Sequence, residues 1–301
     1  RNIFLLVSML IILTLACDVT INLTPDSQAP TAAETPVLVE PPTTTPEIFI
    51  SLTQAIPATA ISTGVQPVEV TIDPLTIALS PVLAGGVRGI QVPRADAEDL
   101  PTWGKTPGHT EIKLEEYILQ GKFHEPKIYV YPASEYALMV PAAFESMHRL
   151  RNVMNASGLA SADELPVVPF FNAAQIFASN FQEISFQNGD GVRFLTEYAQ
   201  YFAPVNNHEL VYHFQGFTDD GEYYIIAILP VTAPMLAATS DAGATIPAGG
   251  IAFPDINDPN ADYQGYYASV TDVLNATRPD AFAPTLSQLD ALIQSMKVNP
   301  Q

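Results

Sequence analysis

The stretch that decides the fold runs from Gln182 to Val231 and reads QEISFQNGDGVRFLTEYAQYFAPVNNHELVYHFQGFTDDGEYYIIAILPV. Its first three runs place apolar residues at alternate positions, which is the period of a strand with one buried face. Clusters of Gly, Asn, Asp and Pro separate the runs, and these residues favour tight turns; they occupy residues 188–191, 204–207 and 219–221. The stretch therefore predicts a meander of four antiparallel strands.

Composition predicts three details of this meander. In the first turn, residues 188–191, glycine and asparagine tolerate the positive φ angles that tight turns need. The second run is expected to continue as one strand from Val192 to Phe202. The last run, residues 222–229, is apolar on both faces, so we expect a central strand that is covered on both sides.

The segments around the meander predict further strands and helices. Pro141 suits the first turn of a helix. Asn172 with Gln175, and Thr285 with Gln288, have the spacing of capping boxes at helix N-termini. The remaining elements are expected as strands at 68–72, 112–119 and 127–131 and as a helix at 263–274. Together they predict a single α+β domain at residues 68–301, a mostly antiparallel sheet with flanking helices and a C-terminal helical segment.

The N-terminal residues resemble the signal of a bacterial lipoprotein. Residues 3–16 are almost wholly apolar, over a length that suits a signal peptide and is too short to span a bilayer. They lead into LTLAC, residues 13–17, which resembles a lipobox: the small residue Ala16 allows cleavage, and the thiol of Cys17 carries a diacylglycerol. We expect residues 1–17 to be this signal and Cys17 to be the lipid-attachment site. An ordinary secretory leader and an uncleaved membrane anchor are the alternatives.

Residues 18–67 are expected to form a disordered tether. They are rich in Thr, Pro and Ala and contain no Lys or Arg, so they offer little apolar surface for a core. A signal, one cysteine, a spacer and then a domain is the order expected of a lipoprotein. It predicts a protein that its lipid holds at the cell membrane, with the folded domain on the extracytoplasmic face.

The charge of the chain excludes one class of partner. Its net charge is −20, from 32 acidic and 12 basic residues. Such a surface repels the phosphates of DNA and RNA, so we expect no nucleic-acid partner. Because Cys17 is the sole cysteine, no disulfide can form within the chain.

Several short motifs of the folded part look familiar. They are LPVVPFFNAAQ (165–175), FQNG (186–189), GVRF (191–194), FQG (214–216), DG (220–221) and LDALI (289–293). As a set they resemble uncharacterised lipoproteins of Chloroflexi-type bacteria, with a similarity that covers residues 68–298. The resemblance implies a surface lipoprotein from a bacterium, and it carries over no catalytic residue.

No catalytic, metal-binding or cofactor motif stands out in the sequence. There is no G-x-S-x-G elbow and no phosphate-binding glycine motif before a helix. His208 and His213 are five positions apart, which on a strand puts them on opposite faces. Asp258, Asn260 and Asp262 alternate like calcium ligands, but no Glu follows at the twelfth position, so a capping loop is the better interpretation. We expect no catalytic residue, metal or cofactor, although paired carboxylates stay open.

Amide and aromatic side chains gather along the meander and the segment before it. Such side chains offer the hydrogen bonds and flat faces that suit sugars or peptides. The alternative is that they cap turns and satisfy buried backbone groups. The candidate ligand-binding residues are Asn172, Gln175, Arg193, Tyr198, Gln200, Tyr212 and Gln215.

Three hypotheses of function follow. The first is a non-enzymatic binding or structural module with a glycan or peptide partner, which a groove lined by the amide and aromatic residues would favour. The second is an extracytoplasmic hydrolase of glycans or peptides, which two carboxylates about 5–10 Å apart in a cleft would favour. The third is a subunit of an envelope protein assembly, which a large exposed apolar patch would favour.

Overall fold

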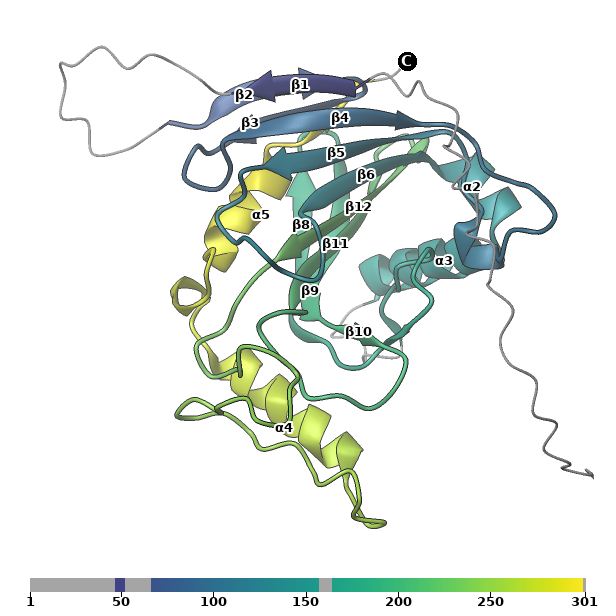
Figure 1. Cartoon of the computed structure of the whole chain (residues 1–301). Helices are drawn as coiled ribbons and strands as arrows, with labels where there is room; N and C mark the ends of the chain where they lie inside the picture. The colour runs from purple at the N-terminus through teal and green to yellow at the C-terminus, as the bar shows by residue number, and fades with distance from the viewer. Residues whose placement is uncertain (1–46, 52–65, 157–163, 300–301) are drawn as a thin grey trace, which may run out of the picture. The chain divides into compact units, whose positions relative to one another are not determined.

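The structure is a computed structural model that describes residues 47–51, 66–156 and 164–299 (Figure 1). Its main feature is a sheet of eight strands in the order β1-β4-β5-β6-β12-β11-β9-β8, in which every neighbouring pair is antiparallel. The strands are β1 (Glu47–Ser51), β4 (Gly86–Val92), β5 (His109–Glu115), β6 (Lys127–Pro132), β8 (Ser179–Phe186), β9 (Gly189–Thr196), β11 (Val211–Thr218) and β12 (Tyr223–Pro230). Helices accompany this sheet, so the α+β fold expected from the sequence is confirmed.

The predicted meander forms half of this sheet. β8 pairs with β9, β9 with β11, and β11 with β12. β12 lies between β11 and β6, and its side chains are buried on both faces. The prediction of a central strand covered on both sides is therefore confirmed.

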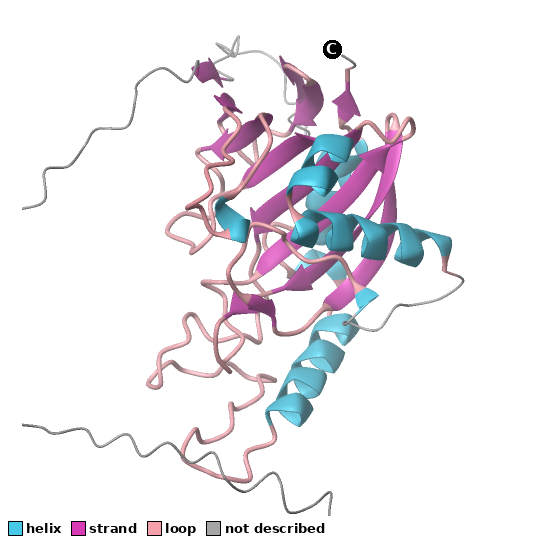
Figure 2. Cartoon of the chain, turned by 90° about the vertical axis from the view of Figure 1, so that its right-hand side faces the viewer, coloured by secondary structure: helices cyan, strands magenta, loops and turns pink. Residues whose placement is uncertain are grey.

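Two layers of helices bury the two faces of the sheet (Figures 1 and 2). On one face, called here the α3 face, α2 (Ala133–Met139) and α3 (Pro141–Asn155) pack over alternate β12 residues such as Tyr224 and Ile226. On the other, the α5 face, α4 (Tyr263–Ala276) and α5 (Leu286–Gln294) both contact β8, and their buried residues belong to the same core as Ile225 of β12. Alternate side chains of a strand therefore belong to two separate cores, one on each face of the sheet.

The glycines of the first predicted turn serve close packing and not positive φ. Residues 187–188 form that turn, and Gly189 and Gly191 already belong to β9. A Cβ atom at Gly191 would lie 2.6 Å from the ring of Phe214, so only glycine lets this ring lie across the strands. In the third turn, by contrast, Gly221 does adopt a φ of 71°.

The second predicted run does not continue to Phe202. β9 ends at Thr196, and the short strand β10 (Tyr198–Ala199) leaves the main sheet to pair with β7 (Ala174–Gln175). The backbone N–H of Ile176 also donates to the carbonyl of Glu197, at 3.1 Å. These bonds carry the chain away from the sheet and bring the segment before β8 beside it.

One predicted capping box is wrong and the other is confirmed. Asn172 and Gln175 start no helix, because Gln175 takes part in the β7–β10 ladder. Thr285 and Gln288 cap α5 reciprocally, as expected. Asp262 accepts from the backbone N–H of Gly265 and caps α4, which confirms the capping loop.

Three strands form a smaller sheet beside α5. They are β2 (Val68–Ile72), β3 (Leu75–Leu79) and β13 (Lys297–Val298), in the order β13-β3-β2. Here β2 confirms the predicted strand, whereas β3 and β4 were not anticipated. β5 begins three residues earlier than expected, at His109. β1 falls within the stretch assigned to the tether, and its backbone pairs with β4.

The N-terminal signal and its Cys17 lie outside the described residues, as does most of the tether. Among the helices that the structure does describe, none combines the length and the apolar character that a membrane crossing requires.

Candidate functional site

The main sheet separates the candidate ligand-binding residues. Arg193 and Tyr212 project to the α5 face, where both bond to Asp290. Tyr198 and Gln215 lie with the core of the α3 face, next to the side chain of His213. A strand places neighbouring residues on opposite faces, so the candidates cannot form one site.

Arg193 holds the meander to α5. Its Nε donates to Oδ1 of Asp290 at 3.1 Å, and its Nη2 donates to Oε1 of Gln182 at 2.7 Å. A further nitrogen donates to the backbone carbonyl of Asn180. The hydroxyl of Tyr212 donates to the same carboxylate, at 2.8 Å. With its donors engaged and its side chain buried, Arg193 ties elements of the fold together.

Gln215 lies in a buried polar network on the α3 face. Ser146 Oγ lies 2.6 Å from the carbonyl of Val167 and 3.0 Å from Oε1 of Gln215, and these two acceptors share its one proton. His213 Nε2 lies 2.8 Å from Nε2 of Gln215, and its Nδ1 lies 3.1 Å from the hydroxyl of Tyr198. Burial lowers the pKa of His213 to about 3, so its ring is neutral. Since these groups satisfy one another away from solvent, the network supports the fold.

Three of the candidates meet at a pocket, called here the aromatic pocket, with a volume of about 520 Å³. Asn172, Tyr198 and Gln200 line it, and Nε2 of Gln200 donates to the carbonyl of Asn172 at 2.7 Å. Gln175 stands behind it, where its Oε1 lies 3.4 Å from the hydroxyl of Tyr198. The pairing of β7 with β10 brings these segments together.

Aromatic rings form a large part of the wall of this pocket. Phe171 packs edge-on against Tyr198, with ring centroids 5.0 Å apart, and stacks on His124 at the same distance. Two more lining rings are open to solvent: Phe123 is 63% exposed and Tyr201 is 76% exposed. Exposed aromatic rings beside a concave surface are typical of binding sites.

A rigid loop, residues 203–209, forms another wall. The hydroxyl of Tyr267 bonds both the N–H and the carbonyl of Ala203, each at 3.0 Å. Asn206 donates its backbone N–H to Oε1 of Glu197 at 2.7 Å, and its own Oδ1 accepts from the N–H of Glu209 at 3.2 Å. Glu209, which lines the pocket, is thus carried on a backbone that is fixed before any ligand arrives.

Glu197 supports this loop from inside the protein. It is fully buried, and desolvation raises the pKa of its carboxyl well above the ordinary value, with a further rise from the nearby charge of Glu209. The hydrogen bond from Asn206 opposes that rise. Glu197 does not line the pocket, so within the described residues Glu209 is the one carboxylate that faces it.

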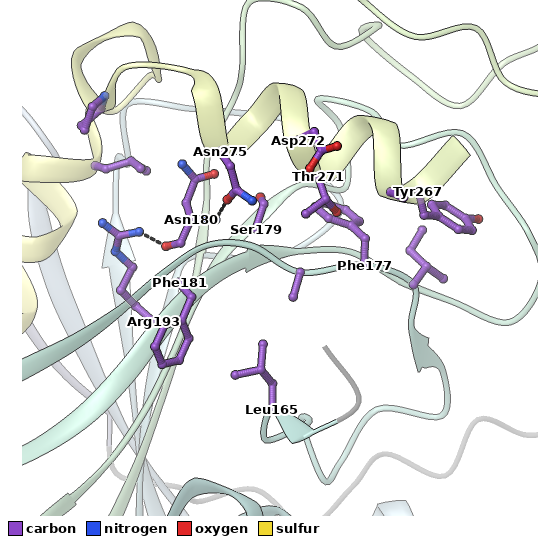
Figure 3. Close-up of a pocket in the computed structure, with 15 residues that line it drawn as sticks. Leu165, Phe177, Ser179, Asn180, Phe181, Arg193, Tyr267, Thr271, Asp272 and Asn275 are labelled. Atoms are coloured by element: carbon purple, nitrogen blue, oxygen red, sulfur yellow. Dashed lines mark hydrogen bonds between the residues drawn. The ribbon is translucent and has the colours of Figure 1, made fainter. Parts of the chain in front are cut away.

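A second pocket, the β8–α4 pocket, has a volume of about 800 Å³ (Figure 3). Arg193 lines it, and a hydrogen bond of 2.6 Å from the N–H of Asn180 to Oδ1 of Asn275 crosses from β8 to α4. Ser179 Oγ and Asn180 Oδ1 are buried without a hydrogen-bond partner. Of the candidate ligand-binding residues this pocket holds Arg193 alone, so it does not gather the predicted cluster.

The sequence did not point to Phe123, His124 or Glu209, because nothing local distinguishes them. Phe123 reaches the pocket through a long-range contact, in which its backbone N–H donates to the carbonyl of His208 at 2.9 Å. Phe170 and its neighbour Phe171 stand in the LPVVPFFNAAQ motif, directly before Asn172, and that adjacency was the available signal.

Comparisons with known proteins add no assignment. No family model matches the chain, and neither the curated proteins nor the solved structures contain a match. The resemblance to Chloroflexi-type lipoproteins therefore stays a prediction.

Proposed function

We propose that this protein is a lipid-anchored, extracytoplasmic binding module that takes its ligand in the aromatic pocket and catalyses no reaction. The signal that ends at Cys17 and the spacer after it support the location. The observation that carries the binding role is the pocket itself. It combines exposed rings at Phe123 and Tyr201 with the amides of Asn172 and Gln200, on a preformed backbone.

This combination suits a ligand with flat faces and polar edges, such as a glycan or a peptide. Aromatic rings pack against sugar rings or apolar side chains, and amides at the rim form hydrogen bonds that fix orientation. The acidic surface keeps such a module soluble at the end of its tether.

Neither of the two pockets described above supports the alternative of a hydrolase that uses paired carboxylates. Among the described residues, Glu209 is the sole acid lining the aromatic pocket and Asp272 the sole acid lining the β8–α4 pocket. Glu197, the acid behind the first pocket, is fully buried and is engaged with the backbone of Asn206. Hydrolysis of a glycoside needs two carboxyl groups on opposite sides of the scissile bond.

A panel of soluble oligosaccharides and short peptides tests the binding role on the purified full chain, with saturation-transfer NMR as the readout. We expect at least one compound to bind, and Phe123→Ala and Tyr201→Ala each to weaken it about 2- to 10-fold, the worth of one aromatic contact. Phe144→Ala is the matched control, because this α3 ring is 58% exposed and lies outside the pocket. Equal binding by all three variants would contradict the proposal.

The anchor is tested separately, by fractionating cells that express the chain or its Cys17→Ser variant. We expect the parent chain in the membrane fraction with an acylated Cys17 at its mature N-terminus, and the variant without the acyl group. An unmodified mature N-terminus in the parent chain would show that the leader is an ordinary secretory one.

One observation favours the third hypothesis, a subunit of an envelope assembly. Trp103, Leu138 and Phe144 are exposed large apolar side chains on a short 3₁₀ helix (Thr102–Gly104), on α2 and on α3, and α3 contacts both of the other elements. Exposed apolar surface of this kind suits a protein partner. This role would be supported if a partner protein co-purified with the parent chain but not with Leu138→Glu, and if the aromatic pocket of that variant still bound its ligand.

A further inference from the structure

We propose that the ligand group entering the aromatic pocket is an organic ammonium ion, held between the aromatic rings and the carboxylate of Glu209. This inference rests on the proposed function and names the chemistry of its ligand. It follows from the charges and the rings that face the pocket.

The first argument is the charge of the pocket. Its lining holds Glu209 and neither Lys nor Arg. Glu209 is half-buried, and within the described residues no side chain forms an ion pair or a hydrogen bond with its carboxylate. A partly desolvated carboxylate without a counter-ion attracts a cation.

The basic side chains of the segments that form the pocket form no ion pair with Glu209. Lys122 points its Nζ to the backbone carbonyl of Asn207, at 2.8 Å. The ring of His208 packs edge-on against Phe123, with centroids 6.2 Å apart. His124 lines the pocket, but burial, together with the charge of His208, lowers the pKa of His124 to about 4. An uncharged His124 does not repel a cation at neutral pH.

The second argument is the wall of rings. The face of an aromatic ring is electronegative, and it attracts a cation that lies within about 6 Å of its centre. Phe123, Phe171, Tyr198 and Tyr201 surround the same volume that Glu209 faces. Several rings together with one carboxylate are what recognises ammonium ions in aromatic cages.

The charge argument also excludes other ligand classes. A carboxylate or phosphate on the ligand would meet Glu209 with no compensating cation in the lining, and the net charge of −20 would oppose its approach. A neutral group can donate a hydrogen bond to the carboxylate of Glu209, but it leaves the negative charge without a counter-ion.

Choline and neohexyl alcohol, the choline skeleton with carbon in place of the charged nitrogen, form a matched pair of probes. Isothermal titration of the purified full chain measures both. We expect choline to bind at least about fivefold more tightly than the alcohol. Added salt should weaken the binding of choline and leave the binding of the alcohol unchanged. Tyr201→Ala should weaken both probes, which places them in the aromatic pocket.

Glu209→Gln isolates the contribution of the carboxylate. The backbone N–H of Glu209, which donates to Asn206, is unaffected by this change. We expect Glu209→Gln to weaken choline about 5- to 10-fold and to leave the alcohol unchanged. Glu183→Gln is the matched control, because this exposed acid on β8 lies outside the pocket and its loss changes net charge equally.

The outcomes separate this inference from the proposed function. If the alcohol binds as tightly as choline, and Glu209→Gln changes neither, the ammonium inference is overturned while the pocket still binds. If neither probe binds at millimolar concentration, the pocket takes no ammonium group, and the panel of glycans and peptides then decides the binding role. If Glu183→Gln weakens choline as much as Glu209→Gln does, the effect comes from overall charge, and the inference fails.

Discussion

Replacement of Glu197 by Gln should stabilise the protein relative to the parent chain, and this difference in the free energy of unfolding should grow as the pH rises. Burial holds the pKa of this carboxyl well above its ordinary value of 4.5, because the charged form would lose its hydration. Above that ordinary value the unfolded chain releases the proton, while the folded chain keeps it. The folded state then binds more protons, so the free energy of unfolding of the parent chain falls as pH increases.

The magnitude follows from one proton. The loss of stability has a ceiling of about 1.4 kcal/mol per pH unit between the unfolded and the folded pKa. Gln at position 197 keeps an oxygen that can accept the N–H of Asn206, and it has no charge to bury. The 3.5 Å contact from Asn206 Nδ2 to Glu197 is dispensable, because the same nitrogen also donates to the carbonyl of Pro204 at 3.1 Å.

The assay is urea unfolding of the full chain, followed by far-UV circular dichroism between about pH 5 and pH 7. Other groups titrate in this range, but His124 and His213 are present in both chains and cancel in the difference. We expect the stability of Glu197→Gln minus that of the parent to rise with pH, and Glu183→Gln to show no such rise. A difference that stays constant with pH would refute the reasoning, because Glu197 would then ionise as it does in the unfolded chain.

Three further changes probe the buried polar contacts. Arg193→Met should destabilise the fold by about 3 kcal/mol, because it leaves the half-buried carboxylate of Asp290 without its cation; thermal and urea unfolding measure this, and a loss below about 1 kcal/mol would contradict it. Ser146→Ala should cost about 1 kcal/mol, the worth of one hydrogen bond, since the carbonyl of Val167 still accepts from Nε2 of Gln215 and Oε1 of Gln215 still accepts from the hydroxyl of Tyr224. His213→Gln should reduce the loss of stability on acidification from about pH 6.5 to pH 4. Because the pKa of His213 is lowered in the folded state, the unfolded chain binds a proton on this ring in a pH range where the folded chain does not. If the variant lost as much stability on acidification as the parent chain does, the result would contradict the burial of a neutral His213.

Much of the fold could be predicted because it depends on short-range patterns in the sequence. The alternation in β8, β9 and β11 is local, as is the apolar run that makes β12 central. Gly221 and the capping box of Thr285 with Gln288 act within a few residues of chain. The same holds for the lipobox-like residues before Cys17, which predict an anchor from adjacent side chains alone.

The candidate site could be predicted only in part. Asn172, Tyr198 and Gln200 do line the aromatic pocket, because they stand in segments rich in amides and rings. Arg193 and Gln215 belong instead to structural networks on opposite faces of the sheet. The sequence shows that such side chains are near one another along the chain. The face of the sheet on which each side chain lies depends on where the strands begin and end.

The sequence by itself determined the meander, the caps of α4 and α5 and the expectation of a lipid anchor, since each depends on neighbours in the chain. Only the tertiary structure decided where the aromatic pocket lies and which acid faces it. Phe123 meets the loop before β11 through a bond to His208, and Glu209 faces the pocket while Glu197 is buried behind it. These relations join segments far apart in the chain, and they are set by strand order and burial, which local patterns do not specify.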